Sequence, residues 1–107
     1  MNKKELIILH IFFIILLLIF TNIKIIIGSG ESMLPTIPTK KILLCIKNRN
    51  YEVNDIIFYK LGKHNVAHRI IAIIDDGTVI QYQTKGDGND TQDRYLITKT
   101  NIKCKVI

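Results

Sequence analysis

Three stretches of the chain carry residue types that together could perform nucleophilic catalysis. Ser32 lies in "GSGESMLPTI", His68 in "VAHRII", and several carboxylates in "TKGDGNDTQD". A serine hydroxyl becomes a nucleophile when a neighbouring base takes its proton, and an imidazole oriented by a carboxylate is such a base. The sequence therefore contains the three chemical groups of a Ser–His–Asp triad.

Ser32 is surrounded by residues that control backbone shape. Gly28 and Gly30 permit sharp backbone angles on one side, and Pro35 stiffens the chain on the other. Such a segment can expose a hydroxyl and direct its own N–H at a developing oxyanion. The alternative is a turn with no catalytic role. If Ser32 is the nucleophile, we expect Met33 and Pro35 to contact the substrate.

His68 lies in a run that is typical of a β-strand. Alternation places Val66, His68 and Ile70 on one face of that strand. A histidine between apolar neighbours is usually a core residue whose hydrogen bonds are satisfied. Imidazole is also the side chain best suited to general-base work near neutral pH, so both interpretations stay open.

The third stretch is rich in glycine and in acidic or amide side chains, namely Asp87, Asn89, Asp90 and Asp93. It can be a solvated loop built from Asx turns, or it can supply the carboxylate that orients His68. The alternating oxygen ligands also resemble a calcium loop. Thr98 stands where that loop needs a bidentate glutamate, which argues against calcium, and we expect no metal.

Short β-branched runs that would position these residues cover most of the chain after the first 27 residues. They are 41–47, 55–60, 65–74, 78–85 and 102–107, and "IKIIIG" could add a first strand. Asp76-Gly77 predicts a two-residue hairpin turn, and Asn54 suits a left-handed turn. We therefore expect a small, mostly β domain, a barrel or sheet of about 80 residues.

The N-terminal part is apolar from Leu6 to Phe20, and continuing through residue 27 reaches the length of a membrane-spanning helix. Lys3 and Lys4 place the N-terminus in the cytoplasm by the positive-inside rule. A cleavable signal peptide is the alternative, but no small-residue cleavage site follows. The expected organisation is a cytoplasmic segment (1–5), a transmembrane anchor (6–27) and an extracytoplasmic catalytic domain (28–107) in the cell membrane.

Charge and cysteine content exclude several other classes. The net charge of +6 comes from scattered lysines without an aromatic and basic stripe, which favours a lipid bilayer over nucleic acid as partner. Cys45 and Cys104 lie in apolar runs, where buried free thiols are the expected state. Their spacing fits no metal site, and nothing indicates a cofactor.

Taken in order, "SGESMLPTI", "DIIFYK", "VAHRIIAI" and "TKGDGNDTQD" resemble the type I signal peptidases, and the resemblance covers Ser29 to Ile107. It implies a signal-peptidase-like β domain after one transmembrane helix. It also implies a membrane-bound serine endopeptidase that cleaves N-terminal signal peptides from exported preproteins.

The resemblance assigns a role to each candidate residue. Ser32 is implied as nucleophile and backbone oxyanion donor, and His68 as general base, as in the serine–histidine branch of the family. Asp93 is implied to orient His68, while Asp87 has a supporting role, for which we expect a pairing with Arg69. Gly30 stands where some members use a serine hydroxyl as oxyanion donor.

Two rival interpretations remain. The chain could be an inactive, membrane-tethered binding module related to signal peptidases, in which Ser32, His68 and Asp93 would not converge. Alternatively, Lys63 or Lys85 could replace histidine as the base.

Overall fold

The computed structural model describes residues 1–47 and 50–107. These residues form helix α1 (Lys3–Asn22), a short 3-10 helix η1 (Lys99–Asn101) and a set of strands. The strands are β1 (Ile23–Ile27), β2 (Ile42–Ile46), β3 (Ile56–Leu61), β4 (His64–Asp75), β5 (Ile80–Lys85), β6 (Leu96–Thr98) and β7 (Ile102–Val106). The predicted mostly β fold behind an N-terminal helix is confirmed.

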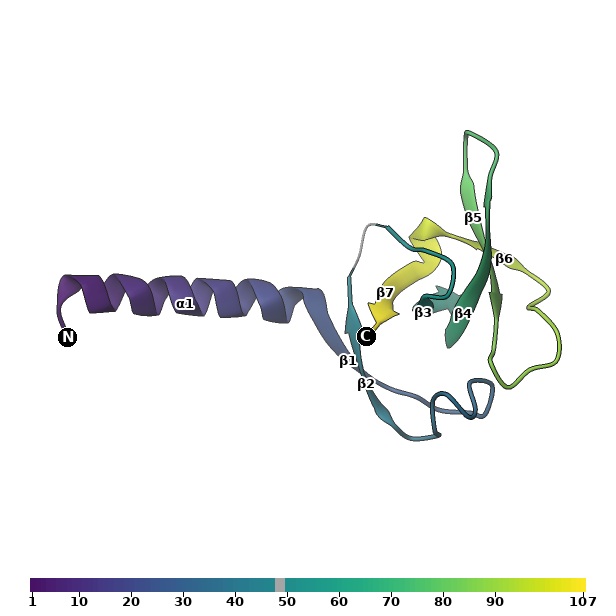
Figure 1. Cartoon of the computed structure of the whole chain (residues 1–107), viewed down its shortest axis with the longest axis horizontal. Helices are drawn as coiled ribbons and strands as arrows, with labels where there is room; N and C mark the ends of the chain where they lie inside the picture. The colour runs from purple at the N-terminus through teal and green to yellow at the C-terminus, as the bar shows by residue number, and fades with distance from the viewer. Residues whose placement is uncertain (48–49) are drawn as a thin grey trace.

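All described strands belong to one sheet with the order β1-β2-β7-β3-β4-β5-β6. Every neighbouring pair is antiparallel. The β2–β7 pairing is short, with only Cys45↔Val106 and Ile46↔Lys105 in register. Figure 1 shows α1 extending away from the β domain, with β1 beginning where the helix ends.

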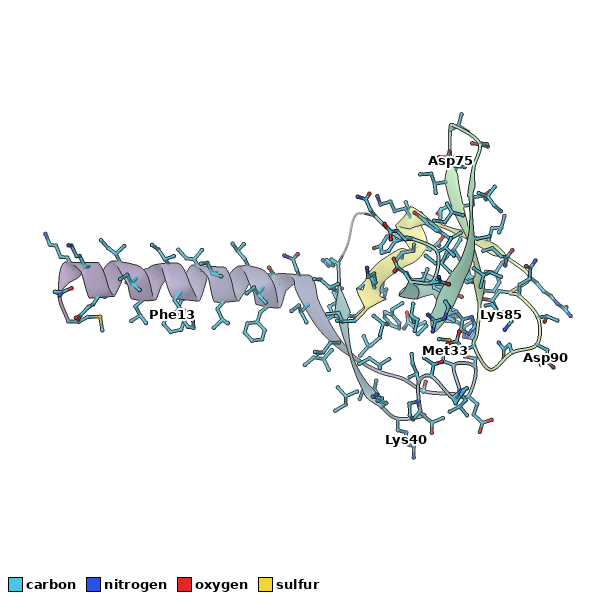
Figure 2. The ribbon with its side chains drawn as sticks, in the orientation of Figure 1. Phe13, Met33, Lys40, Asp75, Lys85 and Asp90 are labelled. Atoms are coloured by element: carbon cyan, nitrogen blue, oxygen red, sulfur yellow. A yellow bond between two sulfur atoms is a disulfide. The ribbon has the colours of Figure 1, made fainter. Side chains whose placement is uncertain are left out.

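Helix α1 has the properties of a membrane span. Asn2 and Glu5 form a capping box at its start, which satisfies backbone N–H groups that a helix N-terminus leaves unpaired. None of its residues is buried, and its apolar side chains point outward all around it (Figure 2). In the described part of the chain it is the helix long and apolar enough to cross a membrane. At about 1.5 Å per residue, its 20 residues reach about 30 Å.

The helix differs in extent from the predicted anchor over 6–27, which was expected to run into the first strand. The helix begins at Lys3 and ends at Asn22. Ile23–Ile27 forms β1, the first strand that "IKIIIG" could supply, and pairs along its whole length with β2. The run of β-branched isoleucines favours a strand once a partner strand is present.

The predicted strands are present, with two differences. β6 was missed because its three residues are too few to show a pattern. Four residues rather than two connect Asp75 to Ile80, and Gly77 alone in that turn has a positive φ, of 88°. Asp76 instead receives hydrogen bonds from the N–H groups after it, which closes a wider turn. The left-handed conformation predicted for Asn54 is confirmed by its φ of 81°.

Two clusters of buried side chains hold the domain together. One comprises Tyr51, Ile57, Tyr59, Ile70, Tyr82 and Ile97, which come from the β3–β6 side of the sheet and the segment before it. The other comprises Met33, Ile37 and Leu43 and lies under the connection from β1 to β2. The first supports the strand that carries His68, and the second supports the loop that carries Ser32.

The expectation of free thiols was wrong. Cys45 on β2 and Cys104 on β7 form a disulfide with a Cα–Cα distance of 5.5 Å. Both cysteines are fully buried. Each run favoured a buried cysteine when considered alone, but the β2–β7 pairing that brings the two together is not visible in either run.

Candidate active site

Ser32 lies on the connection between β1 and β2. Gly30 begins the turn with a φ of +85°, a conformation that suits glycine. Two backbone hydrogen bonds then tighten the loop, from Leu34 N–H to the Glu31 carbonyl and from Ile37 N–H to the Met33 carbonyl. Because Met33 and Ile37 are buried beneath the loop, the segment is fixed on both sides of the serine.

His68 lies on β4, and its ring reaches the serine. Its side chain is almost completely buried, as is that of Ile70 on the same face. Nε2 of His68 is 2.9 Å from Oγ of Ser32. The two interpretations of His68, as a core residue and as a candidate general base, are therefore compatible. Its ring lies on the buried face of the strand, and Nε2 of the same ring contacts the Ser32 hydroxyl.

Asp93 completes the arrangement from the connection between β5 and β6. Its Oδ2 lies 2.7 Å from Nδ1 of His68. A ring that donates its Nδ1 proton to a carboxylate keeps Nε2 as an acceptor for the serine hydroxyl. Two contacts fix the backbone of Asp93, which donates its N–H to the Thr84 carbonyl and accepts at its own carbonyl from Nε2 of Gln83.

A set of buried hydroxyl groups lies behind Asp93 and was not predicted. Oγ1 of Thr84 donates to Oδ2 of Asp93 at 2.6 Å. The hydroxyl of Tyr59 lies 3.3 Å from Thr84 Oγ1 and 2.7 Å from the hydroxyl of Tyr95. Burial raises the pKa of both tyrosines above its usual value. The sequence signal was alternation within β3 and β5, which puts Tyr59 and Thr84 on buried faces.

Gly86 and Gly88 allow the acidic loop to pack directly on the serine segment. A Cβ atom on Gly86 would lie 2.5 Å from the Ser32 carbonyl oxygen and 3.1 Å from Nε2 of His68. A Cβ atom on Gly88 would lie 2.8 Å from the Leu34 carbonyl oxygen. The Gly88 N–H donates to the Ser32 carbonyl at 2.8 Å. Because Gly86 and Gly88 have no side chain, the acidic loop and the serine loop can approach each other closely. Both residues also belong to the glycine-rich turn that the sequence predicted.

Asp87 ties the same two loops to β4. Arg69 donates to both carboxylate oxygens of Asp87, at 2.9 and 2.8 Å, and this is the expected pairing. Thr36, on the serine loop, donates to Oδ2 of Asp87 at 2.6 Å. The hydrogen bonds from Arg69 hold the pKa of Asp87 below its usual range, and those to Asp87 raise the pKa of Arg69.

The remaining candidates fall in different places. Met33 lines the cavity beside Ser32, whereas Pro35 is exposed and is not among the residues that line it. Substrate contact by Met33 and Pro35 stays a prediction. Lys63 lies in the tight turn between β3 and β4, and Nζ of Lys85 contacts the Gly86 carbonyl. Within the described ranges, the base hydrogen-bonded to Ser32 is His68.

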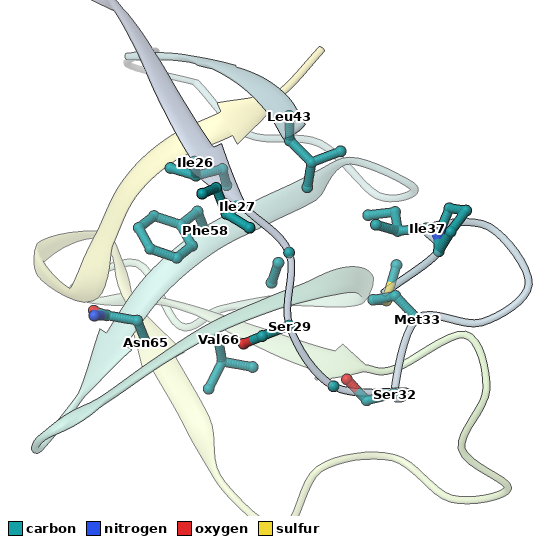
Figure 3. Close-up of a pocket in the computed structure, with 14 residues that line it drawn as sticks. Ile26, Ile27, Ser29, Ser32, Met33, Ile37, Leu43, Phe58, Asn65 and Val66 are labelled. Atoms are coloured by element: carbon teal, nitrogen blue, oxygen red, sulfur yellow. The ribbon is translucent and has the colours of Figure 1, made fainter. Parts of the chain in front are cut away.

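A cavity of about 410 Å³ opens next to the serine. Figure 3 shows it between the end of β1 with the following loop and the strands β3 and β4. Its lining mixes polar and apolar groups: Ile26, Met33, Ile37, Phe58 and Val66 contribute apolar side chains, and Ser29, Ser32 and Asn65 contribute polar ones. The Ser32 hydroxyl therefore stands at the side of an open cavity that could receive both apolar and polar groups of a ligand.

Comparisons of the chain with protein-family models, with curated proteins and with solved structures found no match. The resemblance to signal peptidases therefore depends on the four motifs alone.

Proposed function

We propose that the chain is a membrane-anchored serine endopeptidase of the signal peptidase I type, with histidine as its base. The observation that carries the proposal is the continuous hydrogen-bonded series from Ser32 Oγ through the His68 ring to Asp93 Oδ2, with steps of 2.9 and 2.7 Å. Its substrates are the signal peptides of exported preproteins.

In the proposed mechanism His68 takes the proton of the Ser32 hydroxyl while Oγ attacks the scissile carbonyl carbon. Asp93 holds the imidazole in the required tautomer and stabilises the imidazolium that forms. The imidazolium then gives its proton to the departing amine, which leaves an ester on Ser32. A water molecule, deprotonated by the same imidazole, hydrolyses this ester and restores the serine.

The developing oxyanion needs hydrogen-bond donors. The Ser32 N–H donates no hydrogen bond to any other part of the described chain, so it is available for this role. Gly30 has no side chain to offer one. The oxyanion site we propose is therefore built on backbone N–H groups, with Ser32 as its central donor.

An extended peptide fits the cavity as an added strand. Among residues 1–47 and 50–107, β4 pairs with β3 from His64 onward, but β5 pairs with β4 only from Arg69, so the first residues of β4 have a free edge. In the same part of the chain β1 pairs with β2 alone and is an edge strand. A substrate strand lying between these edges would satisfy its backbone groups and present its scissile carbonyl to Ser32.

We propose that the chain is anchored in the membrane with its β domain outside the cytoplasm, because of the properties of α1, of the outward face of β1 and β2, and of the disulfide. α1 spans the membrane, and the outward face of β1 and β2 carries Ile25, Ile27, Ile42 and Leu44, all exposed. These pair across the strands as Ile25↔Leu44 and Ile27↔Ile42, which makes a continuous apolar face next to the helix. The buried disulfide favours an oxidising compartment, so the β domain would lie outside the cytoplasm.

The test is cleavage of a preprotein by the full chain reconstituted in lipid vesicles. Ser32→Ala is expected to lower the rate on the order of a millionfold, because it removes the nucleophile. Thr78→Ala removes a hydroxyl that is bonded to Asp76 in the turn between β4 and β5, outside the site, and this control is expected to keep cleaving.

A Ser32→Ala protein that processes the preprotein as fast as the parent would overturn the proposal. A parent protein that binds signal peptides in vesicles without cutting any of them would instead identify the inactive binding module. Binding is measured by crosslinking a radiolabelled preprotein to the protein in the vesicles. This separates a protein that binds without cleaving from one that cleaves without Ser32.

A further inference from the structure

Thr84 is a core residue that also makes two hydrogen bonds to Asp93. Its side chain is fully buried on β5, and it contacts Asp93 twice. The Thr84 carbonyl accepts from the Asp93 N–H at 2.9 Å, and Thr84 Oγ1 donates to Asp93 Oδ2 at 2.6 Å. One residue thus holds both the backbone and the carboxylate of Asp93.

The carboxylate needs such a fixed support because of where it lies. Asp93 is on the connection between β5 and β6, outside any strand, so no sheet pairing sets the direction of its side chain. The oxygen that Thr84 contacts is Oδ2, the same atom that accepts from Nδ1 of His68. Rotation of this carboxylate would therefore move the imidazole or break its hydrogen bond.

The hydroxyl groups behind Thr84 fix the direction of its own proton. A hydroxyl has a single proton to donate, and Thr84 donates it to Asp93, so its lone pairs accept from Tyr59 at 3.3 Å. Tyr59 in turn lies 2.7 Å from the hydroxyl of Tyr95. Tyr59 also donates to Asp93 Oδ2, at 3.4 Å, whereas Thr84 donates to the same oxygen at 2.6 Å. The hydroxyls of Thr84 and Tyr59 therefore converge on Asp93, and Thr84 makes the shorter contact.

We propose that Thr84 is a positioning residue of the catalytic site, whose hydroxyl holds Oδ2 of Asp93 in line with Nδ1 of His68. The proposal depends on the peptidase function proposed above. A purely structural role is the competing explanation, since the methyl group of Thr84 also fills the core.

Thr84→Ser and Thr84→Ala separate the two roles. Both variants lose the same methyl group, and only the alanine variant also loses the hydroxyl. We expect Thr84→Ser to keep kcat close to that of the parent. Thr84→Ala is expected to lower kcat by about 10- to 100-fold with KM unchanged, the range for losing one hydrogen bond to a charged group.

A spectroscopic measurement follows the hydrogen bond directly. The proton between His68 Nδ1 and Asp93 Oδ2, which are 2.7 Å apart, is expected to resonate far downfield in a proton NMR spectrum of the detergent-solubilised chain. The resonance is expected to persist in Thr84→Ser and to move upfield or broaden in Thr84→Ala. Thr98→Val deletes a threonine hydroxyl bonded within η1, outside the site, and is the control that leaves resonance and kcat unchanged.

Equal kcat values for the serine and alanine variants would overturn the proposal, as would loss of folding in both, because a positioning role predicts that both variants fold and that only Thr84→Ala is slow. Ser32→Ala is measured beside them. If Ser32→Ala cleaves normally, the peptidase function itself fails. If Ser32→Ala is inactive while the serine and alanine variants at Thr84 are equally fast, only the role of Thr84 fails.

Discussion

Nε2 of His68 lies 2.9 Å from Oγ of Ser32, although the residues are 36 positions apart. Ser32 is on the loop after β1, and His68 is on β4, with β2, β7 and β3 between these strands in the sheet. The serine and its base are thus held together by loop contacts across the sheet rather than by neighbouring strands. Activity should therefore be sensitive to small changes in those contacts.

Replacement of His68 by alanine is expected to reduce preprotein cleavage by an amount comparable to Ser32→Ala. The two residues act as a unit, so the double variant should be little slower than either single variant. Rates measured in reconstituted vesicles check this non-additivity.

The lysine alternatives provide the control for His68. Lys63→Ala and Lys85→Ala change side chains that lie outside contact with Ser32 among the described residues, and both should retain cleavage. If His68→Ala keeps activity and one of the lysine variants loses it, the base has been assigned to the wrong residue.

Gly86→Ala is expected to lower activity strongly at a smaller cost in stability. The new Cβ would lie 2.5 Å from the Ser32 carbonyl oxygen, so the serine loop must move relative to His68. A displacement of about 1 Å can cost on the order of 100-fold in rate. Cleavage rate and the thermal unfolding midpoint, measured together in detergent, check this.

Gly62→Ala is the matched control for Gly86→Ala. Gly62 has a φ of +61°, and a Cβ atom there would meet nothing within 4 Å. Alanine at this position strains the backbone without touching the site, so it should lower stability slightly and leave the rate unchanged. Equal loss of rate in the two variants would contradict the steric explanation.

The sequence predicted those parts of the fold that local pattern determines. The long β-branched runs became strands, Asn54 adopted the left-handed conformation, and the series Ser32, His68 and Asp93 could be named from residue type and motif order. These features depend on a few neighbouring residues. Their convergence in space depends on the whole sheet and is a finding of the structure.

The parts that the sequence did not predict depend on long-range pairing. The Cys45–Cys104 disulfide requires β2 beside β7, a pairing of strands that are far apart in the chain. The role proposed for Thr84 requires the loop after β5 to fold back, so that Asp93 contacts the buried side chain and the carbonyl of Thr84. The end of α1 at Asn22 is set by pairing of the following isoleucines with β2. None of these partners is recognisable from a single run of residues.

Removal of the disulfide is expected to destabilise the domain substantially. Cys45 and Cys104 are 59 positions apart, and a cross-link over a loop of this length contributes about 4 kcal/mol by the loop-entropy relation. The Cys45→Ala/Cys104→Ala variant should unfold at a clearly lower urea concentration than the oxidised parent. Reductant should lower the midpoint of the parent and leave that of the variant unchanged, and a parent insensitive to reduction would contradict the prediction.

The outward face of β1 and β2 is expected to contact lipid. The chain has no tryptophan, so Leu44→Trp gives a single fluorophore on that face. Its emission should be blue-shifted in vesicles and quenched by lipids with brominated acyl chains. Val79→Trp lies in the turn between β4 and β5, which projects roughly at right angles to α1 and apart from β1 (Figure 1). It should be quenched far less, and equal quenching would contradict contact by the outward face of β1 and β2.

Acid is expected to weaken the link between the acidic loop and β4. The pKa of Asp87 is lowered in the folded chain by hydrogen bonds from Arg69, so its ionised form favours the native state. Above the unfolded-state pKa of about 3.9 the contribution is complete. As the pH falls below this value, the carboxylate is protonated in the unfolded chain while it is still ionised in the native state. The stabilisation from ionised Asp87 therefore decreases, and it is lost once the pH falls below the lowered native pKa.

The difference in unfolding free energy between the parent and Asp87→Asn should therefore be constant from pH 7 to about pH 5 and shrink below about pH 4. Urea unfolding of the detergent-solubilised chain, followed by circular dichroism over this range, measures it. Because Arg69 makes the bidentate contact to Asp87, Asp87→Asn should have a smaller effect in an Arg69→Gln background, where the hydrogen bond from Thr36 to Asp87 remains. A free-energy difference that stays constant down to pH 3 would show that Asp87 stabilises the loop through something other than its charge.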